Sequence, residues 1–195
     1  MKISGQLKFS FMGVAKEICP GFMIDDSNRS QIIDIFNWCC TLPGRLDLKK
    51  GLFLYGNVGT GKSTLLMVVK EFTKRLGIKR HNGFSSFGVN KVAGDVCPEF
   101  ASSGYKGIER FISAPAQAFD EVGAETIPTA HFGENCNVMK NILMARYDRR
   151  FSNLTHITLN LSEEGFRKAY GDRVYDRSKE MFNFVEFGGP TRRKK

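Results

Sequence analysis

The residues from Gly56 to Ser63 have the types and spacing of a phosphate-binding loop, because they fit the pattern G-x-x-x-x-G-K-[ST]. Glycines let the backbone wrap closely so that its N–H groups point at phosphate oxygens, and the next helix adds its N-terminal dipole. Lys62 is expected to reach the β- and γ-phosphates and the Ser63 hydroxyl to hold Mg²⁺. The sequence therefore predicts a nucleoside triphosphate site with Mg²⁺. Its binding residues are Gly56, Asn57, Val58, Gly59, Thr60, Gly61, Lys62, Ser63 and Thr64.

Asp120 and Glu121 supply the carboxylates that such a site needs. They come after the apolar residues of a candidate strand. Asp120 is expected to hold Mg²⁺ through water, and Glu121 to orient or deprotonate the attacking water. An Asp-Glu pair is by itself often a solvated loop or a helix start, but its place after a strand favours the catalytic interpretation. Pro115 and Gln117 make that strand a weak one.

Asn160 and two arginines are further candidates. Asn160 ends a strand and could direct its amide to the γ-phosphate or the attacking water, or it could cap the following helix; spacing favours neither. Arg173 and Arg177 lie four residues apart and so share one helical face. They could form a surface ladder with Asp172 and Asp176, which spacing alone favours. The alternative is an arginine offered to the phosphates of a neighbouring subunit.

The elements that must position these residues alternate between strand and helix. Apolar periodicity, caps and Gly or Pro breakers mark their ends. Asp25–Ser27 offers N-caps for a helix that ends at Pro43-Gly44, and residues 1–24 are expected to be irregular. The expected strands are 51–55, 84–93, 114–122 and 156–160. The expected later helices are 62–76, 95–112 with a break at 102–104, 136–150 and one from Ser162. This order predicts a parallel α/β sandwich, and its strand and helix context argues against a chance glycine-rich turn at residues 56–63.

Composition bounds the protein class. The chain has 195 residues, of which 42% are hydrophobic and 25% charged, typical of one globular domain rather than a disordered or collagen-like chain. No apolar run reaches membrane-spanning length and no signal peptide is recognisable, so a cytoplasmic protein without a membrane partner is expected. The five cysteines are expected to be free thiols, since Cys97, His131 and Cys136 lack the spacing of a zinc site. The net charge of +9 allows phosphate-rich partners.

Four segments in order resemble the DnaC/IstB-like branch of AAA+ ATPases, a group of replicative helicase loaders and transposition helper ATPases. They are GLFLYGNVGTGKST, FDEVG, THITLNLS and YGDRVYDR. The resemblance covers about residues 28–193. It implies a P-loop NTPase three-layer sandwich with a mainly parallel sheet, the AAA+ core, at 25–195. It also implies a homo-oligomer that assembles head to tail with ATP at the subunit interfaces.

The resemblance also implies roles for single residues. Lys62, Ser63 and Thr64 fall in Walker A, Asp120 and Glu121 in Walker B, and Asn160 on sensor 1. Arg177 would be the arginine finger, with Arg173 as its neighbour. Arg193, in Gly189–Arg193, would be sensor 2; a disordered basic tail is the alternative for the terminal RRKK.

The resemblance also bears on partners and on the lid, and here the chain departs from this branch in two places. Residues 95–112 occupy the place of a helical insertion that lines a channel for single-stranded DNA, which makes Tyr105, Lys106 and Arg110 candidate contacts. The arm 1–24 is too short for a helicase-gripping domain; either it is a partner-binding segment, or another chain supplies that contact. Only 18 residues follow Arg177, so the AAA+ lid is expected to be minimal or absent.

The leading hypothesis is an ATP-hydrolysing helicase-loader-like factor of DNA replication that acts on single-stranded DNA and a replicative helicase. A transposition helper, whose partner is a transposase, is the alternative within the same branch. A P-loop kinase of a small molecule would show phosphate transfer to a small acceptor. A nucleotide-sensing adaptor would bind ATP with negligible turnover, against which the Asp120-Glu121 pair argues.

Overall fold

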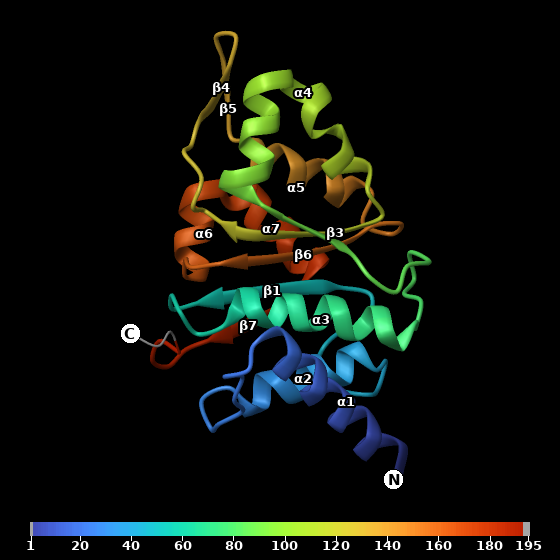
Figure 1. Ribbon diagram of the computed structural model, residues 1–195. Helices are drawn as coiled ribbons and strands as arrows, with labels where there is room; N and C mark the ends of the chain where they lie inside the picture. The colour runs from blue at the N-terminus through green and yellow to red at the C-terminus, as the bar shows by residue number, and fades with distance from the viewer. Residues whose placement is uncertain (1, 193–195) are drawn as a thin grey trace.

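Five parallel strands form the central sheet of the computed structural model, which describes residues 2–192. Their order is β2-β3-β6-β1-β7, and every neighbouring pair is parallel. Their carboxyl ends therefore meet at one edge of the sheet, where Figure 1 shows the arrowheads of β1, β3, β6 and β7. The strands are β1 (Gly51–Gly56), β2 (Gly88–Lys91), β3 (Ala116–Val122), β6 (Leu154–Leu159) and β7 (Phe182–Phe187).

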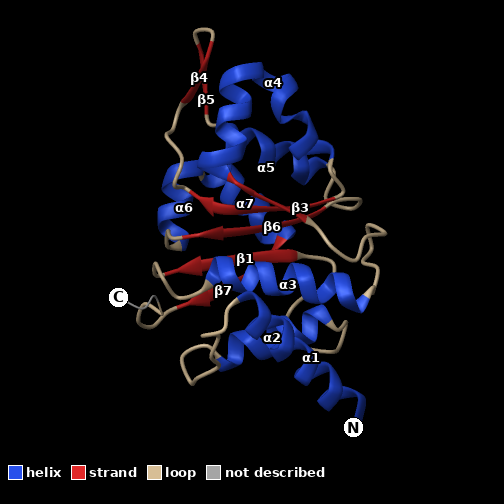
Figure 2. Ribbon diagram, viewed as in Figure 1, coloured by secondary structure: helices blue, strands red, loops and turns tan. Residues whose placement is uncertain are grey.

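Helices cover both faces of this sheet, as Figure 2 shows, so the expected three-layer sandwich is confirmed. Alternate residues of β1 serve the two cores, since successive side chains of a strand point to opposite faces. Leu52 and Leu54 pack with the first helical layer and Phe53 with the second. The first layer is α1 (Lys2–Ile18), α2 (Arg29–Cys39) and α3 (Lys62–Leu76). The second is α4 (Cys97–Ser113), α5 (Val138–Asp148), α6 (Glu163–Tyr170) and α7 (Asp172–Met181).

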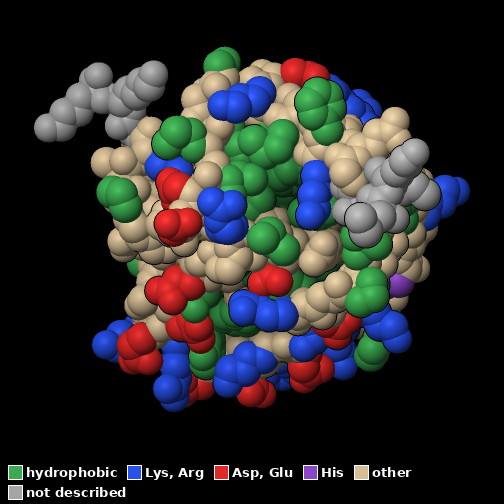
Figure 3. All heavy atoms as spheres, turned by 90° about the horizontal axis from the view of Figure 1, so that it is seen from below, with side chains coloured by type: hydrophobic (Ala, Val, Ile, Leu, Met, Phe, Trp, Pro, Cys, Tyr) green, Lys and Arg blue, Asp and Glu red, His purple; other side chains and the backbone are tan. Residues whose placement is uncertain are grey.

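The prediction that residues 1–24 are irregular is wrong, because α1 occupies most of that segment. Val14 and Ala15 follow Phe11 by three and four residues, and all three are at most 2% exposed. They therefore form the apolar stripe of a helix. Phe11 packs edge-on against Phe72 of α3, with ring centroids 5.0 Å apart. Phe9, on the other side of α1, is 82% exposed. Figure 3 views the molecule from this side and shows apolar side chains in the middle of the face with charged side chains around them.

The predicted break near residue 104 is confirmed. A π-helical turn at Val92–Val96 leads into α4, and Gly104 interrupts α4 with φ 58° and ψ −144°. A side chain at this position would also collide with His131, whose ring lies 2.9 Å from the place of a Cβ. The strand predicted at 84–93 is shorter than expected and consists of β2 alone.

A hairpin and one strand were missing from the sequence prediction. The hairpin consists of β4 (Thr129–His131) and β5 (Glu134–Cys136) and projects from the body beside α4 (Figure 1). It shortens the helix predicted at 136–150, which begins at Val138. The missed strand, β7, follows α7 directly and pairs with β1 along its whole length. Within residues 2–192 no helix follows β7, and no helix in that range has the length and apolarity to span a bilayer.

Candidate nucleotide site

The P-loop joins the end of β1 to the start of α3 in the strand–loop–helix context that the motif requires. Gly59 and Gly61 have φ values of +81° and +96°, a region that L side chains rarely adopt. A Cβ on Gly59 would also lie 2.2 Å from Thr191 Oγ1. Gly61 directly precedes the 15-residue helix α3, whose first N–H groups and dipole favour an anion here.

Lys62 brings a cation into the loop. The residue is 5% exposed, and its Nζ donates hydrogen bonds to the carbonyl oxygens of Gly56 at 2.9 Å and Asn57 at 2.6 Å. Ser63 follows in the first turn of α3, and both residues line a cavity next to the loop. The loop thus presents a positive charge and a hydroxyl side by side.

Asp120 and Glu121 lie on β3 and are linked through one residue of the adjacent strand β6. The hydroxyl of Thr158 donates to Asp120 Oδ1 at 2.5 Å and accepts the backbone N–H of Glu121 at 3.0 Å. The β3–β6 register shifts between Phe119 and Val122, and Glu121 has a φ of +61°. Glu121 at this bulge lines the cavity, while Asp120 is 7% exposed and does not line it. Backbone strain of this kind is concentrated at functional sites.

Many of the predicted residues converge on one cavity of about 460 Å³, within the usual range for small-molecule sites. Gly59–Leu65, Glu121 and Asn160 all line it. Asn160 reaches it because β6 ends at Leu159 and lies between β1 and β3 in the sheet. The Ser63 hydroxyl and the buried Asp120 carboxylate are hard oxygen donors of the kind that Mg²⁺ binds, so these residues fit that ion.

The opposite wall of the cavity comes from segments that sequence reasoning missed. The α1–α2 loop and the start of α2 are mostly apolar here, which suits the flat face of a base. The breaker Pro20-Gly21 indicates a loop, but only the packing of α1 on α3 brings that loop over the cavity. This wall consists of Cys19, Gly21, Phe22, Met23, Asn28, Ile32, Phe187 and Arg192.

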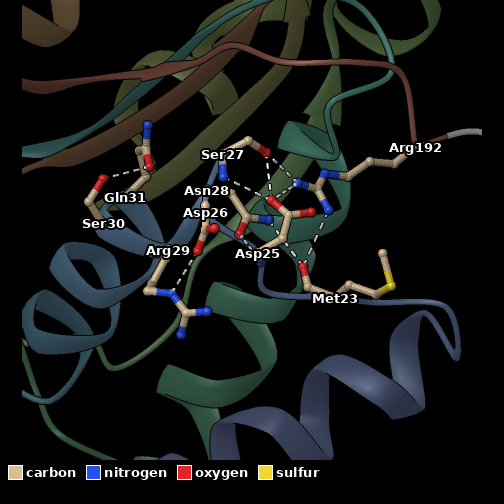
Figure 4. A network of polar contacts seen from close by, with 9 residues as sticks. All are labelled: Met23, Asp25, Asp26, Ser27, Asn28, Arg29, Ser30, Gln31 and Arg192. Carbon is tan, nitrogen blue, oxygen red and sulfur yellow. Dashed lines mark hydrogen bonds and ion pairs between the residues drawn. The ribbon is translucent and has the colours of Figure 1, made fainter.

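Arg192 lines the cavity, whereas Arg193, the predicted sensor 2, lies outside the described residues. The Nη2 atom of Arg192 lies 2.9 Å from Asp25 Oδ1 and 2.9 Å from Ser27 Oγ (Figure 4). Asp25 also accepts hydrogen bonds from the backbone and hydroxyl of Ser27. Arg192 and then Ser27 lower the pKa of Asp25 to about 2. The prediction that Asp25–Ser27 caps α2 is wrong, because Asn28 holds the N-cap position.

Arg177 lies outside the cavity lining, on α7 in the second helical layer. Its Nη1 is 3.7 Å from Asp148 Oδ1, and its guanidinium carbon lies 4.5 Å above the centre of the Tyr147 ring. Arg173 is exposed. Asp172 pairs with Arg167, and Arg177 pairs with Asp148. The ion pairs among residues 2–192 therefore do not include the expected surface ladder of Arg173 and Arg177 with Asp172 and Asp176.

The predicted DNA contacts lie on α4, on the sheet face opposite α1, α2 and α3. Tyr105 is 48% exposed, and its hydroxyl accepts a hydrogen bond from Asn141 Nδ2 at 3.3 Å. Lys106 is exposed. Arg110 pairs with Glu99 at 2.8 Å, so its charge is partly neutralised within the helix. Tyr105 and Lys106 are thus the stronger candidates of the three.

Comparison with known proteins finds no family model and no curated protein that matches this chain. Solved structures do match it in fold. A primosome component from Streptococcus pyogenes serotype M3 is 21% identical with a TM-score of 0.61, over 87% of this chain and 84% of that one. The DnaC helicase loader is 16% identical with a TM-score of 0.64, over 88% and 96%. A replication initiator DnaA is 16% identical with a TM-score of 0.55, over 88% and 50%; it was solved bound to AMPPCP and single-stranded DNA.

These similarities confirm the expected fold, which is that of the AAA+ P-loop NTPases. The structural neighbours include helicase loaders, the class that the four sequence segments resemble. At such low identity the likeness concerns the fold, and function has to be argued from the site.

Proposed function

We propose that this chain is an ATP-binding and ATP-hydrolysing AAA+ protein that acts in DNA replication as a helicase-loader-like factor. The observation that carries the proposal is the convergence of the P-loop, Glu121 and Asn160 on one cavity of about 460 Å³. Three strands of one sheet bring these groups to the same edge. Such convergence of a phosphate loop, a base and a polar orienting group is what phosphoanhydride hydrolysis requires.

Each group has a distinct part in this chemistry. The loop N–H groups and Lys62 bind the β- and γ-phosphates, and Ser63 and Asp120 would hold Mg²⁺, which neutralises phosphate charge. Glu121 accepts a proton from the attacking water while the water oxygen forms its bond to the γ-phosphorus. The bond to the β-phosphate oxygen then breaks, which yields ADP and phosphate. Asn160 orients the γ-phosphate or the water.

The replication role is supported by the kinds of protein that share the fold, among them a helicase loader and a primosome component. A replicative helicase is therefore the proposed partner. Residues 1–24 remain the candidate partner-binding segment, because α1 buries one face on α3 and leaves Phe9 exposed. Arg177 is proposed as the finger of a homo-oligomer, since it lies outside the cavity of its own subunit. Single-stranded DNA is proposed to contact Tyr105 and Lys106, with Arg110 beside them.

The variant Glu121→Gln tests the ATPase and its partner together. It should bind ATP as the wild type does while hydrolysis falls at least about 100-fold, because the general base is lost. Glu164→Gln, on the exposed first turn of α6, is the matched control and should hydrolyse normally. Wild-type turnover no faster than that of Glu121→Gln would contradict an ATPase and favour a nucleotide-sensing adaptor. Phosphate transfer to a small acceptor would favour a kinase.

The partner is then identified by loading tagged Glu121→Gln with ATP in its native lysate and analysing what it retains. Retention of a replicative helicase, reproduced with the purified helicase, supports the loader. Retention of a transposase would make the protein a transposition helper with the same ATPase chemistry. If neither is retained, the replication role fails while the ATPase proposal stands on its own assay.

A further inference from the structure

The last described residues of the chain return to the P-loop after β7. The backbone N–H of Arg192 donates to the carbonyl oxygen of Gly59 at 2.8 Å. Thr191 packs against Gly59 so closely that a Cβ there would collide with it. A Cβ on Gly61 would lie 3.9 Å from Cδ of Arg192, so the arginine stem passes close to the residue that precedes α3. Arg192 is therefore anchored beside the phosphate end of the cavity.

The charge of Arg192 is matched by Asp25 rather than left to the cavity. Nη2 of Arg192 bonds both Asp25 Oδ1 and Ser27 Oγ, and Nη1 lies 3.5 Å from the carbonyl oxygen of Met23 (Figure 4). Asp25 is itself fixed by two hydrogen bonds from Ser27. The aspartate that receives Arg192 is thus a prepared acceptor that lies just outside the cavity lining, between the lining residues Met23 and Asn28 in the sequence.

We propose that Asp25 and Arg192 form a latch, in which Asp25 competes with nucleotide phosphate for the Arg192 guanidinium. The latch rests on the proposed function, because it requires the cavity to accept a nucleoside triphosphate. Phosphate oxygens and carboxylate oxygens are both preferred partners of a guanidinium, so the two acceptors draw on the same donors. When the triphosphate binds, the Arg192 guanidinium exchanges Asp25 for phosphate oxygens. The segment 23–27 is then no longer held by Arg192. Arg192 thereby becomes a nucleotide-binding residue, and Asp25 sets how readily nucleotide enters.

The neighbouring aspartate shows that this arrangement is particular to Asp25. Asp26 has a fully exposed side chain and is 3.6 Å from Arg29, which is itself largely exposed. Asp25 pairs with Arg192, which lines the cavity, whereas Asp26 pairs with Arg29, which does not. Asp26→Asn therefore removes the same charge one residue away without touching the latch, which makes it the matched control for Asp25→Asn.

Calorimetric titration with ATP and Mg²⁺ tests the latch on the full chain. Asp25→Asn should bind ATP about threefold more tightly than the wild type, because an exposed ion pair no longer competes. Arg192→Ala should bind about tenfold more weakly, because a charge-assisted contact to phosphate is lost. Asp25→Asn combined with Arg192→Ala should bind as weakly as Arg192→Ala alone, because Asp25 acts through Arg192. Asp26→Asn should match the wild type.

Several results would overturn the latch. Unchanged or weaker binding by Asp25→Asn would mean that Asp25 does not compete. Equal gains in Asp26→Asn, or a gain that persists without Arg192, would reduce the effect to general charge. If the wild type binds ATP while Asp25→Asn does not differ from it, the latch fails and the proposed function stands. If the wild type, folded by circular dichroism, binds no ATP, the proposed function itself fails.

Discussion

The two walls of the nucleotide cavity differ in chemistry and in origin. The P-loop wall is built from consecutive residues, Gly59–Leu65, and carries Lys62 and the N-terminus of α3. The facing wall combines the α1–α2 loop, the start of α2 and the chain after β7, and is apolar except near Asn28 and Arg192. The ion pair that holds Arg192 in this wall is with Asp25, 167 positions earlier in the sequence. One wall is a local structure, and the other exists only when the segments 19–32 and 187–192 come together.

This difference separates binding from control. The P-loop wall holds its cation through backbone carbonyls of the same loop, so its geometry follows from the loop itself. The facing wall is held by side chains from two distant segments, and one acceptor can be exchanged for another there without rebuilding the fold. We therefore expect variants of the P-loop wall to abolish binding and variants of the facing wall to tune it.

The largest expected effect concerns Arg177, the proposed finger that a neighbouring subunit of the proposed homo-oligomer would supply. Arg177→Ala should lower hydrolysis by about 1,000-fold and leave ATP binding intact, because an arginine finger stabilises charge only in the transition state. Lys62→Ala should instead lose binding. Mixtures of the two variants should regain part of the activity, measured as phosphate release, because some interfaces then carry an intact finger and an intact P-loop.

No recovery at any mixing ratio would count against active sites shared between subunits. Arg173→Ala is the comparison variant, since this exposed arginine is the other candidate finger. A loss confined to Arg173→Ala would move the finger to that residue. Thermal melting checks that the loss of Arg177 contacts with Tyr147 and Asp148 has not unfolded α7.

A smaller effect is expected at Thr158 on β6, which is hydrogen-bonded to both Asp120 and Glu121. Thr158→Val removes the hydroxyl that joins Asp120 to the backbone of Glu121 without changing side-chain volume. We expect kcat to fall about tenfold, because a hydrogen bond to a buried carboxylate is lost, while KM for ATP changes little. Thr158→Ser keeps the hydroxyl and should restore most of the rate. A rise in KM with unchanged kcat would show that Thr158 serves binding rather than positioning.

The smallest expected effect lies far from both walls. Tyr105→Ala should leave ATP affinity unchanged and weaken binding of a fluorescent single-stranded oligonucleotide about fivefold, because one stacking surface is lost. Phe151→Ala removes a more exposed aromatic ring, 81% exposed against 48% for Tyr105, from a turn outside α4 and is the control. Equal oligonucleotide affinity in wild type and Tyr105→Ala would remove α4 from the proposed DNA surface.

Much of the fold was predictable where local patterns are strong. The alternation of buried strands with periodic helices predicted the sandwich, and a polar, glycine-containing run predicted the kink at Gly104. Helix α1 was missed because its apolar stripe of Phe11, Val14 and Ala15 is short. The stripe is buried only because α1 packs on α3, which the local sequence does not indicate. Strand β7 was missed because it follows α7 without a turn and carries polar residues such as Asn183 and Glu186.

The sequence by itself determined the phosphate loop, the paired carboxylates and Asn160, because each depends on a few neighbouring residues at the end of a strand. Only the tertiary structure decided which of them meet, how Thr158 links Asp120 to Glu121, and that Arg192 lines the cavity. It also moved Asp25 from an expected helix cap to the partner of Arg192. A carboxylate pairs with the best donor within reach, and for Asp25 that donor is Arg192, 167 positions later in the sequence.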